Sequence, residues 1–414
     1  MQKLTLTGEV SPGQVPGGGA AILQEKTVNP SRQLQEVTAD ADLGFDALSK
    51  VNVAATALKN LTITPTSQQQ VIDLPNDAVG YGVLTVEAGG GPSADSMVGW
   101  YTGNETSLAF TGSEVKGLRQ AGELNLSFAN ATTIGEYAFT RMRIKSISAQ
   151  NKALNIGSYS FNYSLFTGNI EFTASAIGSN AFGYAGAKTI TVHGNCTVDD
   201  GAFMRLASAD NTYCDVSLAD ATVLDDETFK YASVRNVDLS SAVTLGNGTF
   251  TNAIISGEVD LSNYVGVSAG GQTNRFNAAT VTDTGSLKLP KLEYVNMKEF
   301  YGIKVMGSLM LPSVKEVKQN GFQNSSIRGG LYLDSVETFG SGAFSGIGES
   351  GYQYDIYIGS DTVPTAVSGM FGNPKASAVV VHVPAAMLQS YLDNSVWAGL
   401  VSSKVSIVGD YVKA

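Results

Sequence analysis

The feature that most constrains this chain is a phenylalanine that recurs every 21 to 27 residues from residue 139 to residue 371. Eleven residues mark the period: Phe139, Phe161, Phe182, Phe203, Phe229, Phe250, Phe276, Phe300, Phe322, Phe344 and Phe371. Such a period is typical of a solenoid, in which each unit is too small to bury its own core and packs against its neighbours. We therefore predict an α/β-type repeat solenoid dominated by short β-strands, with about eleven repeats of ~23 residues.

Each repeat joins a short strand to a turn that ends in the phenylalanine. The clearest turns read I-G-x-x-A-F or I-G-x-x-S-F, at residues 134–139, 156–161 and 177–182. The strands have an apolar–polar–apolar pattern, which buries one face and points the middle residue outward. We expect these strands at residues 144–147, 170–172, 190–192, 216–218, 237–239, 259–261, 287–289, 309–311, 331–333 and 356–358.

Changes in composition and repeat pattern along the sequence predict five segments. Residues 1–20 form an extended Gly- and Pro-rich arm, and residues 21–90 form two tandem β modules of ~35 residues, in which Pro30 aligns with Pro65. Residues 91–118 are a linker and N-terminal cap, and the solenoid covers residues 119–375. Residues 376–414 are a C-terminal cap with a strand, a helix over 385–393 and a last strand, as an open solenoid end requires.

Charge and hydropathy limit the classes of partner. The net charge of −11 argues against nucleic acid, which needs clustered Lys and Arg. The chain has no apolar run long enough to span a membrane, so we expect no membrane insertion. Its first twenty residues lack the pattern of a secretory signal. We therefore expect an extracellular or virion location, or a bacterial cell surface if an export signal has been removed.

Few residues suggest catalysis or a cofactor. The two histidines, His193 and His382, lie far apart in the sequence and have no recurring acidic partner, so we predict no catalytic or metal pair. Nucleotide-binding and hydrolase motifs are absent from the sequence. We predict a protein that is not an enzyme and has no cofactor.

The acidic turns and the two cysteines can each be interpreted in two ways. Acidic turns at residues 199–200 and 225–227 suit calcium, although Asp is also a good turn residue, and we favour the turn role. The two cysteines, Cys196 and Cys214, lie in adjacent repeats, and we favour two thiols over a disulfide.

Exposed tyrosines are the remaining candidates for a binding surface. Tyr332 and Tyr357 occupy the middle of their strands, whereas Tyr231 and Tyr301 lie beside repeat phenylalanines. Tyrosine suits interfaces because it brings a large contact area and a hydroxyl at low entropy cost. The alternative is that these rings only cover the core of the neighbouring repeat.

The I-G-x-x-A-F step after an apolar strand resembles the BspA-like leucine-rich repeats, over about residues 115–412. The closing residues Val383-Pro384-Ala385, Tyr391, Trp397 and Ile407 are similar to the usual C-terminal end of that family. The resemblance implies a curved solenoid and a role in adhesion to host proteins or other cells. Residues 210–300 depart from the consensus, which puts any shared ligand face there in doubt.

The N-terminal tandem units resemble a module of phage tail and other virion proteins, from Pro30 to Val53 and from Pro65 to Val86. This resemblance implies a virion-attached protein whose solenoid binds a host cell or a mucosal polymer. The expected partners are a host surface protein or glycan, or other virion subunits, with homo-oligomerisation through residues 1–90. Alternatives are a bacterial surface or secreted adhesin and, less favoured, a carbohydrate-active enzyme.

Overall fold

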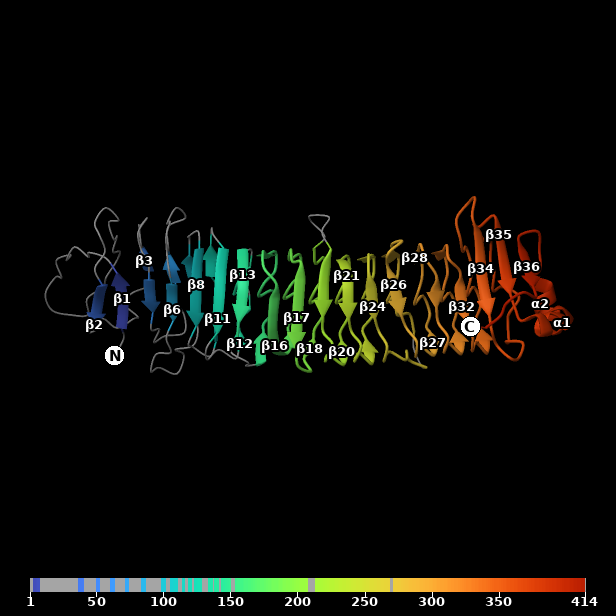
Figure 1. The fold of residues 1–414 in the computed structure, drawn as a ribbon, viewed down its shortest axis with the longest axis horizontal. Helices are drawn as coiled ribbons and strands as arrows, with labels where there is room; N and C mark the ends of the chain where they lie inside the picture. Colours follow the sequence, from blue (N-terminus) through green and yellow to red (C-terminus); the bar gives the residue numbers. More distant parts are fainter. Residues whose placement is uncertain are drawn as a thin grey trace. The chain divides into compact units, whose positions relative to one another are not determined.

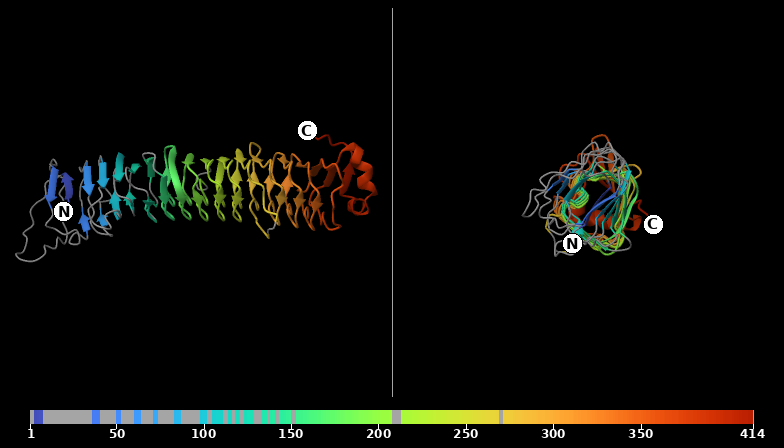
Figure 2. Two further views of the ribbon diagram at one scale, coloured as in Figure 1. Left: turned by 90° about the horizontal axis from the view of Figure 1, so that it is seen from below. Right: turned by 90° about the vertical axis from the view of Figure 1, so that its left-hand side faces the viewer.

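The structure is a computed structural model that describes residues 133–413 apart from 137, 141–142, 150–152, 208–212 and 269–270. Before residue 133 it describes only strands β1 to β11. The chain divides into two compact units, Met1–Cys196 and Thr197–Ala414. In each unit, short strands stack side by side along one direction while the chain coils round a common interior (Figures 1 and 2). This arrangement confirms the predicted β-rich solenoid.

The first unit contains three runs of paired strands. In the first run, β1 pairs antiparallel with β2 and β4, and all the other pairs are parallel. Its strands in spatial order are β2 (Glu36–Asp40), β1 (Lys3–Thr7), β4 (Asn60–Ile63), β6 (Val83–Val86), β8 (Glu105–Phe110), β11 (Glu123–Phe128), β13 (Arg143–Ser148) and β15 (Leu165–Phe166).

The other two runs of this unit are parallel. The second contains β3 (Lys50–Asn52), β5 (Val71–Asp73), β7 (Val98–Tyr101) and β10 (Leu118–Gln120). The third contains β9 (Glu114–Val115), β12 (Thr133–Ile134), β14 (Ala153–Ile156), β16 (Ile170–Ile177) and β17 (Thr189–His193). Apart from the strands, residues 1–118 lie outside the described residues, so the arm, the tandem modules and the linker stay predictions.

The second unit has three walls of parallel strands. The first wall precedes the phenylalanine turns and contains β18 (Thr197–Val198), β20 (Val223–Leu224), β22 (Thr244–Leu245), β27 (Tyr294–Val295), β30 (Glu316–Val317) and β33 (Thr338–Phe339). The second wall follows those turns and contains β19 (Cys214–Ser217), β21 (Ser233–Asp238), β23 (Ile254–Ile255), β25 (Thr280–Val281), β28 (Lys304–Val305) and β31 (Ser326–Ile327).

The third wall carries most of the strands predicted for this half of the chain. It contains β24 (Glu258–Asp260), β26 (Ser286–Lys288), β29 (Leu309–Met310), β32 (Leu331–Leu333), β34 (Gln353–Ile358), β35 (Ala378–His382) and β36 (Val405–Val408). The chain ends in a cap made of the 3-10 helix η2 (Ala385–Met387) and helices α1 (Leu388–Asp393) and α2 (Ser395–Leu400).

The interior of each unit is built on stacked phenylalanine rings. In the first unit, Phe161 stacks between Phe139 and Phe182 with ring centroids 5.4 and 5.2 Å apart. In the second unit, the stack runs from Phe203 to Phe371 at 5.1 to 5.6 Å per step. All these rings are buried except that of Phe371, which is half-buried. The repeat phenylalanine is therefore a core residue of both units.

In the turn around each phenylalanine, successive backbone N–H groups donate alternately to the next repeat and to the same turn. Phe229 N–H donates to Thr249 O of the next repeat at 2.8 Å, whereas Lys230 N–H donates to Glu227 O of its own turn at 2.9 Å. To achieve this, the residues two before and two after the phenylalanine adopt the left-handed conformation, as Glu227 (φ 57°) and Tyr231 (φ 59°) do. The turn is thus hydrogen-bonded both within its repeat and to its neighbour.

Candidate binding surface

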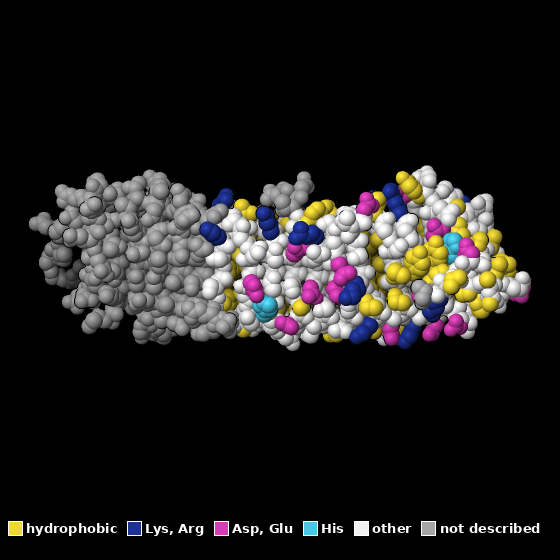
Figure 3. All heavy atoms as spheres, in the orientation of Figure 1, with side chains coloured by type: hydrophobic (Ala, Val, Ile, Leu, Met, Phe, Trp, Pro, Cys, Tyr) yellow, Lys and Arg dark blue, Asp and Glu magenta, His cyan; other side chains and the backbone are white. Residues whose placement is uncertain are grey.

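Four outward-pointing side chains line up across the third wall and form what we call the outer row: Met310, Tyr332, Tyr357 and His382. Each is the middle residue of an apolar–x–apolar strand, so its neighbours point into the core while it points out. The strand register places Met310 beside Tyr332, Tyr332 beside Tyr357, and Tyr357 beside His382. Hydrophobic side chains gather over this C-terminal part of the second unit (Figure 3).

The rings of the outer row stack on one another. Tyr332 and Tyr357 have centroids 4.3 Å apart and planes 4° apart, and His382 stacks on Tyr357 at 4.3 Å and 15°. Gly330 makes this stack possible, because a Cβ there would lie 2.7 Å from Cε2 of Tyr357. Its φ of +98° is also a conformation that favours glycine.

Carboxylates from neighbouring segments hold the stack. His382 Nδ1 lies 2.7 Å from Asp410 Oδ1, and its Nε2 lies 3.1 Å from Asp355 Oδ1. Tyr411 leans over Tyr357 with ring centroids 5.3 Å apart, and its hydroxyl donates to Asp334 Oδ1 at 2.7 Å. Burial, together with smaller effects of Tyr332 and Asp355, raises the pKa of Tyr357 to about 12. The phenol of Tyr357 is therefore neutral at physiological pH.

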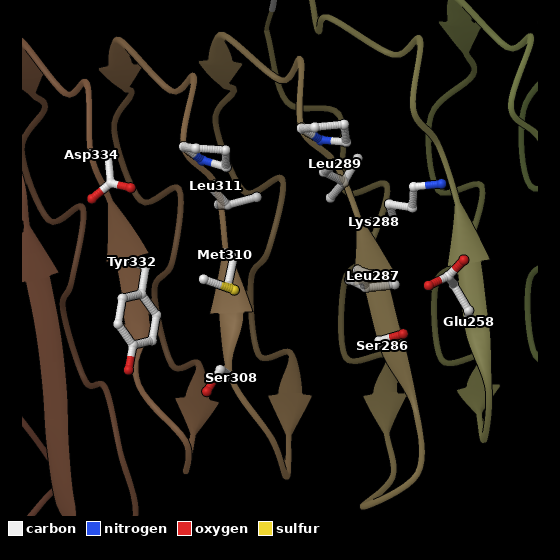
Figure 4. A pocket seen from close by; sticks show the side chains of 12 residues that line it. Glu258, Ser286, Leu287, Lys288, Leu289, Ser308, Met310, Leu311, Tyr332 and Asp334 are labelled. Atoms are coloured by element: carbon white, nitrogen blue, oxygen red, sulfur yellow. The ribbon is translucent and has the colours of Figure 1, made fainter. Parts of the chain in front are cut away.

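A groove of about 350 Å³ lies beside the outer row, and its lining includes Glu258, Ser286, Lys288, Met310, Tyr332 and Asp334. It crosses strands β24, β26, β29 and β32 (Figure 4). Its position follows from a break in the third wall, because β24 pairs with β26 and β29 pairs with β32, whereas β26 and β29 share no ladder of hydrogen bonds in the described part of the chain. The groove lies over this interruption of the ladder.

Tyr332 is the ring of the stack that meets the groove. Tyr357 has Tyr332 on one face and His382 on the other. Tyr332 has Tyr357 on one side and lies in register with Met310 on the other, and Tyr332 and Met310 line the groove together. Tyr411 lies tilted at 55° against Tyr332 with ring centroids 6.2 Å apart, and the Met310 side chain is 55% exposed. The outer row therefore contributes a thioether and one aromatic ring to the lining of the groove.

Comparison with known proteins identifies the repeats. A family model described as the BspA type leucine rich repeat region matches residues 132–255 and 272–354 in 6 copies, which together make half of the chain. The chain belongs to the BspA-type leucine-rich repeat family. The predicted family resemblance is thereby confirmed.

Solved structures give only distant likenesses to this BspA-type chain. The pneumococcal vaccine antigen PcpA is 14% identical, with a TM-score of 0.30, over 84% of this chain and 96% of that one. A leucine-rich cell surface protein from Faecalibacterium prausnitzii A2-165 is 12% identical, with a TM-score of 0.30, over 85% of this chain and 90% of that one. No curated protein matches the chain. None of the described helices is long and apolar enough to cross a membrane.

The four tyrosines predicted as binding residues of this BspA-type protein do not form one surface. Tyr332 and Tyr357 come together in the outer row, whereas Tyr231 and Tyr301 lie in the phenylalanine turns. The guanidinium of Arg205 lies 4.6 Å from the ring centre of Tyr231, and the hydroxyl of Tyr301 accepts a hydrogen bond from Asn324. A binding role for any of the four stays a prediction.

Sequence reasoning missed several residues of this surface. Met310 and His382 hold the same middle position as the two tyrosines, and a comparison of that position across all repeats would have found them. Asp334 and Tyr411 are 77 residues apart and leave no local signal.

The acidic turns act as turn residues in the BspA-type repeats. Asp200 Oδ1 accepts from Asp226 N at 3.1 Å, and Asp226 Oδ1 accepts from Asn247 N at 2.6 Å. Burial, with a smaller contribution from Asp225, raises the pKa of Asp199 and of Asp200. Among the described residues, no group of three or more His, Cys, Asp or Glu side chains could hold a metal ion.

The other residues singled out in the sequence have local roles. His193 Nε2 lies 2.8 Å from Glu171 Oε1 at the surface of the first unit. Cys196 and Cys214 are both buried thiols, as favoured from the sequence.

Proposed function

We propose that this chain is a non-enzymatic adhesion protein that binds its target through the outer row and the groove beside it. The observation that carries this proposal is the stack of Tyr332, Tyr357 and His382 on the outward face of a repeat wall. On β24 and β26 of the same wall the middle positions are charged, and Asp260 and Lys288 form an ion pair at 2.6 Å. The aromatic and thioether residues are therefore concentrated in one place.

The physical support is preorganisation. The rings of the outer row are stacked, and His382 and Tyr411 are hydrogen-bonded to carboxylates, so less side-chain entropy is lost on binding. Tyrosine and methionine are enriched at protein interfaces, where they supply contact area. A flat face of this kind suits attachment to a large surface better than enclosure of a small substrate.

Binding of the labelled full chain to mucin-coated plates and to plates coated with fixed bacterial cells tests the proposal. We expect the wild type to bind at least one surface and the double variant Tyr332→Ala/Tyr357→Ala to bind it at least tenfold more weakly. The matched control is Tyr163→Ala/Tyr184→Ala, which removes another stacked tyrosine pair, at 4.4 Å, from the turns of the first unit. Equal binding by all three proteins, or no binding by the wild type, would contradict the proposal.

We further propose that the protein is carried on a phage particle through residues 1–90. The support is the resemblance of the units at 26–53 and 61–86 to virion modules. Mass spectrometry of purified virions should detect the chain at a constant ratio to the capsid protein. Its absence from the particle would favour carriage on a bacterial surface instead.

Residues 1–90 are also the proposed site of homo-oligomerisation. Size-exclusion chromatography with light scattering should give a higher protomer number for residues 1–414 than for residues 92–414. Equal protomer numbers would mean that the oligomer contact lies outside residues 1–90.

A further inference from the structure

The groove beside Tyr332 has its apolar and polar groups in separate places. Met310 and Tyr332 supply apolar contacts in its middle. Ser286 and Ser308 line one rim, at the N-terminal ends of β26 and β29 (Figure 4). Pro290, Pro312 and Asp334 line the opposite rim, beyond the C-terminal ends of the strands.

Each rim also carries a carboxylate. Glu258 pairs in register with Ser286, so it lies on the serine rim. On the opposite rim, Oδ1 of Asp334 accepts the Tyr411 hydroxyl, while its Oδ2 accepts no hydrogen bond from the described residues. Both rims can therefore accept hydrogen bonds from hydroxyl groups of a ligand.

The charges of the groove select against an anionic ligand. Lys288 is the only basic residue that lines it, and its Nζ already lies 2.6 Å from Asp260 Oδ2. The two rim carboxylates therefore dominate the field in the groove. A sulfated or carboxylated polymer would be repelled, whereas an uncharged ligand that carries many hydroxyls would not.

The break between β26 and β29 does not fit a peptide strand. Some Cα atoms of the two strands lie within 8 Å of each other, whereas an inserted strand would need about 10 Å between its two neighbours. A ligand must therefore lie on the wall and bind through side chains. A pyranose ring matches this arrangement, because its C–H groups lie on its faces and its hydroxyls lie round its edge.

We propose that this groove binds a neutral hexopyranose unit of a glycan. Tyr332 stacks on the C–H face of the sugar, Met310 contacts it from the wall, and Asp334 and Glu258 accept hydrogen bonds from its hydroxyls. The inference rests on the proposed function, because it names the ligand class of the same surface.

Isothermal titration calorimetry of the full chain with four hexasaccharides tests this inference: chitohexaose, mannohexaose, maltohexaose and laminarihexaose. We expect at least one to bind, and Tyr332→Ala to lower its affinity at least tenfold. Asp334→Asn should lower the affinity at least threefold, because it weakens an acceptor on the rim. Tyr213→Ala is the control, since this exposed tyrosine lies outside the groove, and the affinity of this variant should stay within twofold of the wild type. Thermal melts establish that each variant is folded.

The outcomes separate the sugar inference from the adhesion proposal. If no hexasaccharide binds, or if Tyr332→Ala binds as well as the wild type, the sugar inference is wrong. Adhesion that depends on Tyr332 and survives periodate oxidation of the coated surface would then assign the groove to a protein partner. If a hexasaccharide binds through Tyr332 but neither coated surface does, the sugar inference stands and the adhesion proposal fails.

Discussion

At the scale of single residues, the position of a tyrosine in the stack determines which groups its ring contacts. Tyr357 lies between the rings of Tyr332 and His382, whereas Tyr332 has Met310 as its other neighbour and lines the groove. The enclosure depends on a residue without a side chain, Gly330, which lies against both tyrosine rings.

We predict that Gly330→Ala destabilises the protein by about 1–3 kcal/mol, because the new Cβ meets the Tyr357 ring and the positive φ strains any other residue. The matched control is Gly307→Ala in the preceding repeat, where a Cβ would meet nothing within 4 Å. It should change stability by less than about 0.5 kcal/mol. Chemical denaturation measures both, and equal effects would contradict the role given to Gly330.

Asp215 gives a pH-dependent prediction. Its Oδ1 accepts from Arg235 Nε at 2.9 Å, and Arg235, together with the backbone N–H and the side chain of Asn236, lowers its pKa despite an opposing effect of burial. A lowered folded-state pKa stabilises the protein above the unfolded value of about 3.9 and loses that effect as the pH falls through the folded value.

The stability difference between the wild type and Asp215→Asn should therefore be constant from pH 7 to pH 5. It should shrink as the pH falls below about 4, where the unfolded aspartate binds a proton. Denaturation series at several pH values measure the difference. A difference that grows towards low pH would contradict the assignment.

At the scale of the repeat, two neighbouring turns have a charged residue before the phenylalanine, where most turns have a small one. Most turns have Ala, Ser, Thr or Gly there, but Phe276 follows Arg275 and Phe300 follows Glu299. Both side chains are buried, and Arg275 Nη1 lies 2.9 Å from Glu299 Oε2. Thr273 and Tyr264 also donate to the Glu299 carboxylate.

We predict that Glu299→Ala costs about 3–5 kcal/mol, because it leaves the Arg275 charge buried without its partner. The double variant Arg275→Met/Glu299→Leu should recover most of that loss, since it removes both charges and keeps the interior filled. Denaturation of the single and double variants measures the coupling. A double variant as unstable as Glu299→Ala would show that the pair contributes through packing rather than charge.

The repeats also show how far the sequence determines the structure. The Phe139 to Phe371 period and the apolar–x–apolar triplets were enough to predict the solenoid and its outward positions. The groove was not predictable, because Leu287–Leu289 and Leu309–Leu311 have the same pattern as the paired triplets, although their ladder is interrupted. The two short strands that flank each turn were also missed, since two residues such as Glu316–Val317 carry too little periodicity.

At the scale of the whole second unit, the cap closes the open end of the core. Tyr391 and Trp397 are fully buried, and the Trp397 indole packs at 5.9 Å against Phe339 of the last repeats. Its Nε1–H donates to Pro364 O at 2.7 Å. The segment predicted as one helix over 385–393 contains η2 and α1, whereas α2 was not predicted.

We predict that Trp397→Ala destabilises the cap by about 3–5 kcal/mol and that the damage stays close to it, because each repeat contacts only its neighbours. Hydrogen exchange measured by mass spectrometry should rise around residues 339–371. It should stay unchanged around Phe229 and Phe250. A uniform rise across the unit would mean that the repeats unfold as one block.

The phenylalanine stack of the second unit limits how the number of repeats can change during evolution. Each inner ring needs only the ring before it and the ring after it, at nearly constant spacing from Phe203 to Phe344. A recombination event that gains or loses one whole repeat would therefore leave the remaining stacks unchanged. An insertion of a few residues within a turn would instead displace a ring and uncouple its neighbours, so gene length should vary among descendants in steps of one repeat.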